Sequence, residues 1–552
     1  MKLSRRSALA LIGIGASAPA VAAARPATPV SFLHGVASGD PTTRGAILWT
    51  RVTPPSGHDA PVALEWIVAE LGSETPVERG RIDARAARDF TAKVEAKRLK
   101  AGRDYRYWFE ADGVRSPEGR FRTLPVGATR DAVFAVVSCQ LYGGGLFNAY
   151  DAIAKLDRLD AIIHLGDYIY EYGADGYGSA TAQALGRIVE PPHEIVTLAD
   201  YRTRHALYKR DLDLQAAHAR AAMIAVWDDH ETANDSWIDG AQNHQPASEG
   251  TWKARKAAAM QAYFEWMPIR DPVAGRPWEA INRSFDFGDL ATLAMVETRL
   301  LARSQQVASK GETPSAEDFA AALAERNRTD RELLGSEQAR WLEDRLRTSV
   351  DAKRPWQVLG NQVVMARVPG PDVETLLTAE QRAGLTTLPP ATTRQLAAAQ
   401  ASYKAGLPFN LDSWDGYPAA RERLYASFRR AGSHPLVLSG DSHAFWANDL
   451  RDQAGRAVAA EFGTSAITSP SIGDSLPQLP LGRMLEQASE EVQFCDQRAK
   501  GFILLTLTHK RARAEYQAVS TIVAKPYALS TIARFDVAAL DHTLRRETAI
   551  PN

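Results

Sequence analysis

Ala161-Ile162-Ile163-His164-Leu165-Gly166-Asp167-Tyr168-Ile169-Tyr170 is the stretch of this chain that decides its fold. The apolar run from Ala161 to Leu165 predicts a buried strand. Gly166 allows a tight turn, so Asp167 presents a carboxylate where the chain leaves the sheet. In open α/β sheets, ligands bind at the carboxyl ends of the strands. For an isolated Gly-Asp pair, an aspartate that caps the next segment is the alternative.

Four more apolar runs, over 134–137, 223–226, 356–359 and 435–438, end in residues that can bind metal ions or phosphate. They lead into Ser138-Cys139-Gln140, Trp227-Asp228-Asp229-His230-Glu231, Gly360-Asn361-Gln362 and Ser439-Gly440-Asp441-Ser442-His443. If the sheet brings these ends together, their charges are costly to bury without cations. The pattern therefore predicts a metal centre, with Asp167 best placed to bridge two ions.

These motifs, in this order, resemble the signatures of PhoD-type alkaline phosphatases. The resemblance rests on Ser-Cys139-Gln, Gly166 to Glu171, Trp227 to Glu231 and Gly440 to His443, and it covers nearly the whole chain. It implies an α/β fold: a metallophosphoesterase α/β/β/α layered sandwich preceded by a small N-terminal β-sandwich domain, related to purple acid phosphatases.

The resemblance also implies a set of metal ligands. They are Cys139, Asp167, Tyr170, Asp229, Asn361, Asp441 and His443. The implied ions are Fe³⁺ and Ca²⁺, although these ligand types also allow zinc or manganese. A tyrosinate at Tyr170 suits a trivalent ion, and a core tyrosine is the alternative. The amide oxygen of Asn361 suits Ca²⁺, and a turn residue is the alternative.

Three of these ligands depend on local structure. Asp441 and His443 alternate along an extended segment, so both face one site only if the backbone kinks after Gly440. By analogy with the fold, His443 would bind the tyrosinate-bound ion and Asp441 the other. The strand-end position of Cys139 favours a thiolate ligand, whereas a disulfide with Cys495 is the alternative for an exported protein.

The expected catalytic residues are Asp167, Asp229 and His230. His230 would contact the phosphate or act as an acid, with an ordinary capped loop as the alternative. Asn234 and Arg299 are candidate substrate-binding residues because they could reach phosphate oxygens. A loop role for Asn234 and a salt-bridge role for Arg299 are the alternatives.

The implied activity is two-metal hydrolysis of phosphate mono- and diesters by a metal-activated hydroxide, with an alkaline optimum. One alternative is a phospholipase D-like phosphodiesterase of the same family. Another, of a different class, is a non-catalytic exported protein that binds phosphate esters. The full complement of ligand types argues against that last alternative.

Composition and the first residues predict where the protein acts. The 552 residues include 65 basic and 66 acidic side chains, and no basic block suggests a nucleic-acid-binding surface. Residues 1–24 combine Arg5-Arg6, a short apolar run and Ala22-Ala23-Ala24, which predicts a twin-arginine signal peptide read by the twin-arginine export machinery. An ordinary secretory signal is the alternative. We therefore expect an exported, periplasmic or secreted protein without a transmembrane anchor.

The sequence predicts four segments. They are the signal peptide at 1–24, an N-terminal β-sandwich domain at 29–125, a catalytic domain at 131–535 and a tail at 536–552. Tyr105, after Leu99 and Gly102, predicts the tyrosine corner of a sandwich. Helices are expected at 147–156, 201–222, 252–266 and 337–350, the last with Ser336 as its N-cap. Segments 303–331 and 367–410 look irregular, and either a lid or a surface insertion fits them.

Overall fold

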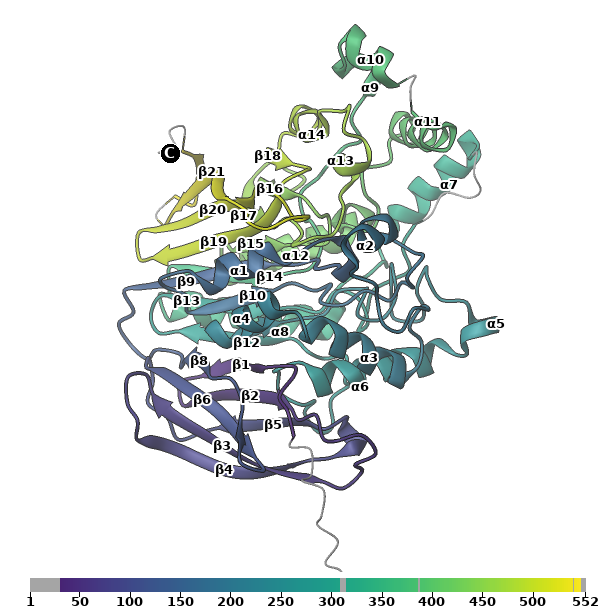
Figure 1. Ribbon diagram of the computed structural model, residues 1–552. Coiled ribbons are helices and arrows are strands. Elements are labelled where there is room, and N and C mark those ends of the chain that lie inside the picture. The colour runs from purple at the N-terminus through teal and green to yellow at the C-terminus, as the bar shows by residue number, and fades with distance from the viewer. Residues whose placement is uncertain (1–29, 308–313, 386–387, 540, 548–552) are drawn as a thin grey trace, which may run out of the picture.

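The computed structural model describes residues 30–307, 314–385, 388–539 and 541–547. Two large sheets pack face to face, with helices on their outer faces, and a third, smaller sheet lies at the N-terminal end (Figure 1). The predicted layered α/β fold with its N-terminal β-sandwich is confirmed. The predicted signal peptide, residues 1–24, lies outside the described residues.

The first large sheet has ten strands and contains the strand that precedes Asp167. In sheet order they are β22 (Leu544–Arg546), β21 (Leu529–Ala538), β20 (Arg511–Val519), β19 (Lys500–Thr508), β9 (Asp131–Val137), β10 (Ala161–His164), β11 (Met223–Ala225), β1 (Val36–Thr42), β2 (Gly45–Arg51) and β5 (Thr91–Ala96). β9, β10 and β11 run parallel, so their carboxyl ends meet on one side.

The second large sheet has seven strands. Their order is β12 (Arg283–Phe287), β13 (Ala291–Met295), β14 (Trp356–Gly360), β15 (Leu436–Ser439), β17 (Ala457–Gly463), β16 (Phe445–Arg451) and β18 (Val492–Asp496). β13, β14 and β15 are parallel, and an isolated bridge between Ser138 and Ala466 joins the two sheets near the end of β9.

The main core lies between these two sheets. Phe134 of β9 packs edge-on against Phe287 of β12, with ring centroids 4.9 Å apart. Burying one such side chain contributes about 1.5–3 kcal/mol to folding. On the outer faces, α1 and α4 pack over the ten-stranded sheet and α8 and α12 over the seven-stranded sheet.

The helices have the following bounds. They are α1 (Asn148–Ala154), α2 (Ser179–Leu185), α3 (Leu198–Lys209), α4 (Leu212–Arg220), α5 (Pro246–Glu249), α6 (Trp252–Trp266), α7 (Ala316–Arg326), α8 (Ser336–Asp351), α9 (Val373–Leu376), α10 (Ala379–Leu385), α11 (Pro390–Lys404), α12 (Pro418–Ala431), α13 (Ile472–Ser475) and α14 (Leu481–Ala488). None of the helices in the described ranges is both long and apolar enough to cross a membrane.

The N-terminal sandwich shares a sheet with the catalytic region. Its small sheet contains β4 (Pro76–Ala84), β3 (Val62–Glu70), β6 (Asp104–Ala111), β7 (Val114–Arg115) and β8 (Gly119–Arg122), which pack on β1, β2 and β5. The tyrosine corner is present, because the Tyr105 hydroxyl accepts a hydrogen bond from the Lys100 amide at 2.9 Å. β1 pairs with β11 at Gly39, where a Cβ would lie 2.6 Å from the Met223 carbonyl oxygen. Only glycine allows this approach.

Two helix predictions are corrected. The predicted helix 201–222 is two helices, because the Asp211 carboxylate caps α4 by accepting hydrogen bonds from the amides of Asp213 and Leu214. Ser336 is the first residue of α8, and its N-cap is Gly335, with φ at +74°. A capping serine has extended backbone, whereas this turn needs a left-handed residue.

Segments 303–331 and 367–410 are more regular than expected. The first contains α7, which Ser315 and Asp318 start with a capping box, and the second contains α9, α10 and α11. Phe319 and Leu407 belong to one small apolar cluster, so the two segments pack against each other. In Figure 1 they project together from the upper right of the molecule.

Candidate metal centre

The ends of β9, β10 and β11 face the ends of β14 and β15, so the site lies between the two large sheets. Cys139, Asp167, Asp441 and His443 all have left-handed backbone, with φ at 60°, 57°, 61° and 57°. Such conformations cost about 1–3 kcal/mol each in non-glycine residues and concentrate at functional sites. They also supply the kink after Gly440 that lets Asp441 and His443 face the same space.

Three groups of side chains could each hold one metal ion, with candidate ligand atoms within 4.8 Å of one another. The groups are Cys139, Asp167 and His443; Asp167, Asp229 and His230; and Asp228, Asp229 and Asp441. Asp167 belongs to the first two groups and Asp229 to the last two. The three positions therefore form a row that two shared carboxylates connect.

Tyr170 lies beside the first group. Its hydroxyl donates to Asp167 Oδ2 at 3.0 Å and lies 3.3 Å from Nε2 of His443. Ser469 donates a hydrogen bond to the same phenol at 2.7 Å. Nδ1 of His443 donates to the Pro470 carbonyl at 2.6 Å, so the lone pair of the neutral imidazole is on Nε2, facing Asp167. This is the tautomer that a ligand through Nε2 requires.

The donor set fits cations. Asp167 Oδ1, Asp228 Oδ2 and Asp229 Oδ1 are buried and have no hydrogen-bond partner among the described residues. Burial, then the neighbouring Asp167 charge, raises the pKa of Cys139 and of Tyr170 well above their ordinary values. Burial likewise raises the pKa of Asp441 to about 7. A cation reverses these shifts, because it stabilises the deprotonated forms.

Neighbouring carboxylates favour the protonated form of His230. Its Nδ1 donates to Glu171 Oε2 at 2.7 Å, and its ring packs on Tyr170 with centroids 4.2 Å apart. Burial alone would lower the pKa of His230, but the charges of Asp229, Glu171 and Asp167 raise it well above 6.5. Nδ1 is occupied by Glu171, so the Nε2 proton is the one free for an anionic ligand.

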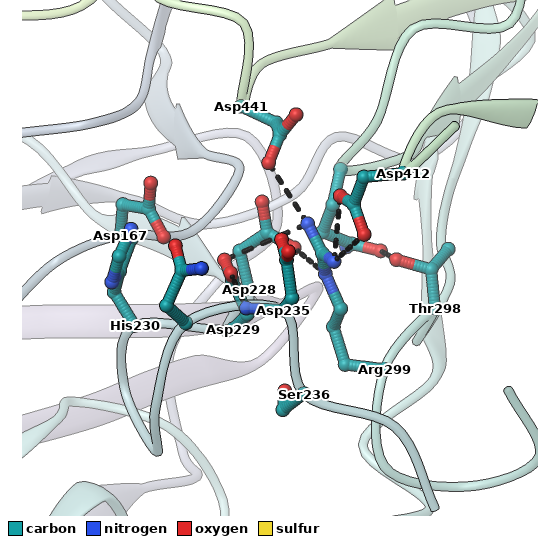
Figure 2. Close-up of polar contacts among 12 residues, drawn as sticks. Asp167, Asp228, Asp229, His230, Asp235, Ser236, Thr298, Arg299, Asp412 and Asp441 are labelled. Carbon is teal, nitrogen blue, oxygen red and sulfur yellow. Dashed lines mark hydrogen bonds and ion pairs between the residues drawn. The ribbon is translucent and has the colours of Figure 1, made fainter. Parts of the chain in front are cut away.

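Arg299 is at the centre of the carboxylates. Figure 2 shows its guanidinium between Asp228, Asp412 and Asp441, with Asp229 and Asp235 nearby. Nη1 lies 2.8 Å from Asp412 and Nη2 2.8 Å from Asp441, and Nε pairs with Asp228. Arg299 is fully buried, so its donors are directed at carboxylates. This geometry favours the salt-bridge alternative, and a direct phosphate contact stays a prediction.

Two other predicted site residues lie outside these groups. Asn361 Oδ1 accepts a hydrogen bond from the Trp414 indole at 3.0 Å, and its Nδ2 donates to the Val363 carbonyl. A carbonyl oxygen has two lone pairs, so one lone pair of Asn361 Oδ1 remains available for the predicted Ca²⁺ contact. The side-chain amide of Asn234 donates a hydrogen bond to Gln242 Oε1 at 3.0 Å. The contact of Asn234 with phosphate stays a prediction.

Several polar residues of the site were not predicted. They are Glu171, Asp228, Glu231, Asp235, Asp412 and Ser469. Glu231 accepts hydrogen bonds from the backbone amides of Asp167, Tyr168 and Asp228, so one carboxylate fixes two strand ends. Glu171 and Glu231 stand inside the quoted motifs, and counting every carboxylate there would have found them. No local signal marks Asp412.

The cysteines settle one alternative. Cys139 and Cys495 are both buried free thiols, so the Cys139–Cys495 disulfide is excluded.

The two facing sheets, with carboxylate, imidazole, phenol and thiol groups gathered at their carboxyl ends, have the layered architecture of the metallophosphoesterase fold. A family model described as PhoD-like phosphatase matches residues 134–516, and one described as its N-terminal domain matches residues 16–125. Alkaline phosphatase D of Bacillus subtilis (strain 168) is 32% identical over 518 residues, which cover 91% of this chain and 80% of that protein. A solved structure titled "Structure of PhoD" superposes with a TM-score of 0.77 at 30% identity, covering 96% of this chain and 94% of that one. The chain belongs to the PhoD-like phosphatase family and is a phosphoric ester hydrolase.

Proposed function

We propose that this phosphatase hydrolyses phosphate mono- and diesters at a two-metal centre that Asp167 bridges, with Fe³⁺ and Ca²⁺ as its ions. The observation that carries the proposal is the row of buried and half-buried donor groups that share Asp167 and Asp229. Cys139, Tyr170 and His443 would hold the first ion with Asp167. Asp229, Asn361 and Asp441 would hold the second.

Bound there, the two ions would offset the charge of the phosphate and lower the pKa of a water molecule. The side chains supply the rest of the chemistry. His230, protonated and aligned by Glu171, would donate from Nε2 to a phosphate oxygen and stabilise the charge that develops there. Arg299 would keep Asp228 and Asp441 in place while the site is formed. Its charge limits the repulsion between the carboxylates.

Initial rates on p-nitrophenyl phosphate, bis(p-nitrophenyl) phosphate and phosphatidylcholine, with metal content measured by mass spectrometry, test the proposal. Turnover of the first two substrates by protein that contains iron and calcium supports it. Fast cleavage of phosphatidylcholine alone would identify the phospholipase D-like alternative. Binding without turnover in metal-replete protein would identify a binding protein.

We also propose export through the twin-arginine pathway, which rests on Arg5-Arg6 and the residues that follow. In the double variant Arg5→Lys, Arg6→Lys the precursor should stay inside the cell, because that pathway reads the guanidinium pair. Unchanged activity outside the cytoplasm would show that another route reads the signal.

A further inference from the structure

A buried lysine lies behind the turn that carries Asp167. Lys209, the last residue of α3, is 1% exposed, and no carboxylate in the described part of the chain forms an ion pair with it. Its Nζ lies 4.5 Å from the ring centroid of Trp49 and 5.3 Å from that of Tyr168. Burial lowers the pKa of Lys209 well below its usual range, which favours a neutral amine. Such a group needs a hydrogen-bond partner.

That partner is His218 of α4. The Lys209 amine lies 3.1 Å from His218 Nε2, and the Tyr168 hydroxyl lies 2.7 Å from the same nitrogen. The roles depend on the tautomer of the ring: with the proton on Nδ1, Nε2 accepts from the Tyr168 hydroxyl, and with the proton on Nε2, it donates to the lone pair of the neutral amine. Nδ1 itself has no hydrogen-bond partner among the described residues. Lys209, His218 and Tyr168 thus form one continuous chain, which we call the lysine chain. It connects α3, α4 and the turn after β10.

Tyr168 is fixed at its main chain as well. Its amide donates to Glu231 at 2.6 Å, and its carbonyl accepts from the Gln140 side chain at 2.7 Å. On one side of it is Asp167, with φ at 57°, and two residues further on is Tyr170. The side chain of Tyr168 therefore connects this strained turn to α3 and α4 through its contact with His218.

We propose that Lys209 and His218 are positioning residues of the phosphatase: through Tyr168 they hold Asp167 and Tyr170 in the orientation that the metal centre requires. The inference rests on the proposed two-metal centre. Lys209, His218 and Tyr168 are buried polar side chains, and each needs a hydrogen-bond partner. Met, Leu and Phe could fill the same space without that requirement, so packing alone does not explain these three residues. None of the three side chains belongs to the candidate metal-binding groups.

Tyr168→Phe is the most conservative test, because it removes one hydroxyl and keeps the ring. Its matched control is Tyr263→Phe, since Tyr263 is also buried but its hydroxyl has no hydrogen-bond partner in the described structure. We expect Tyr168→Phe to lower kcat on p-nitrophenyl phosphate by about 10- to 100-fold with KM little changed, because small displacements at a reacting centre are this costly. Tyr263→Phe should stay within about twofold of wild type.

Further variants separate positioning from packing. Lys209→Met and His218→Leu should resemble Tyr168→Phe, and the double variant Lys209→Met, Tyr168→Phe should be no slower than Tyr168→Phe alone, because members of one chain are not additive. His218→Gln should recover part of the rate, since its amide oxygen can still accept from Tyr168.

Two readouts do not depend on turnover. Iron should be lost faster to a chelator from Tyr168→Phe than from Tyr263→Phe. Amide hydrogen exchange over residues 166–170 should be faster in Tyr168→Phe, and this measurement remains decisive if the wild type proves to hold no metal and the proposed function fails. A Tyr168→Phe protein with wild-type kcat, iron retention and exchange, whatever its Tm, would overturn the inference.

Discussion

The phenol of Tyr170 donates a hydrogen bond to Asp167 Oδ2 at 3.0 Å, while Nε2 of His443 lies 3.3 Å from the same phenol oxygen. The tyrosine and the aspartate follow β10 in the ten-stranded sheet, and the histidine follows β15 in the seven-stranded sheet. An ion bound here would therefore join the two halves of the core. Loss of either partner should be visible in the metal content.

Asp167→Asn and Tyr170→Phe should have different effects on the two ions. Asp167 belongs to two of the candidate groups, so Asp167→Asn should weaken both ions and reduce turnover by at least about 100-fold. Tyr170→Phe should lower iron affinity and abolish any tyrosinate-to-iron absorption in the visible, while calcium stays bound. Loss of the Tyr170 hydroxyl should lower the free energy of unfolding by no more than about 1 kcal/mol, because the ring is kept. Metal analysis and absorption spectra check this, and a Tyr170→Phe protein that keeps both colour and rate would make Tyr170 a core residue.

The two cysteines provide a matched pair. Cys139→Ser should lose iron and most activity, because an alcohol is a poor replacement for a thiolate ligand. Cys495→Ser, at another buried free thiol that accepts a hydrogen bond from Gln497 and lies outside the candidate groups, should keep its iron and its rate. Equal iron content in the two variants, measured by mass spectrometry, would remove Cys139 from the site.

Arg299→Gln should make the fold depend on metal. Without the guanidinium, its buried partner Asp228 and its half-buried partner Asp441 are uncompensated, which should cost about 3–5 kcal/mol in metal-free protein. Bound cations should restore most of that loss. Arg421→Gln breaks another buried pair, with Asp415 at 2.7 Å, outside the candidate groups, so metal should not rescue it. Thermal melts with chelator and with added metal compare the two; similar rescue of both would contradict the role given to Arg299.

Stability should fall in mild acid. Burial lowers the pKa of His34, His164 and His205 to about 3, so each stays neutral in the folded protein. The unfolded chain binds these protons below its ordinary pKa of about 6.5, so the free energy of unfolding decreases from about pH 6.5 towards pH 3. Each group contributes a slope of up to about 1.4 kcal/mol per pH unit. Denaturant titrations of His205→Phe at several pH values should show a smaller slope than wild type, and a parallel curve would mean that His205 is already charged when folded.

The strand ends could be predicted because their information is local. An apolar run followed by Gly166-Asp167 indicates both a buried strand and a turn that exposes a carboxylate, and the same reasoning located Cys139 and Asp441. The start of α8 could not be predicted in this way. Ser336 is a favourable N-cap by type, but Gly335 takes that position because the turn needs a positive φ, which depends on how the preceding segment enters.

The remaining parts of the site depend on tertiary structure. Asp412 pairs with Arg299 although the two residues are 113 positions apart in the sequence. No motif around Asp412 indicates that it belongs to the site. Glu231 was visible in its motif, but its task is to hold backbone amides, which no side-chain pattern displays. Ligand types can be read from a sequence, whereas the groups that orient the ligands appear only when distant segments meet.

The pairing of β1 with β11 has a consequence for how small this enzyme can be. β11 leads directly to Asp228 and Asp229, and it is flanked by β10 on one side and β1 on the other. Without the N-terminal region, β11 would become an exposed edge strand, with unpaired amides and carbonyls beside the catalytic loop. Such an edge invites a second chain to add to the sheet. By pairing with β11, the N-terminal sandwich thus protects the sheet from aggregation. Deleting it should lower solubility even though none of the candidate metal ligands would be removed.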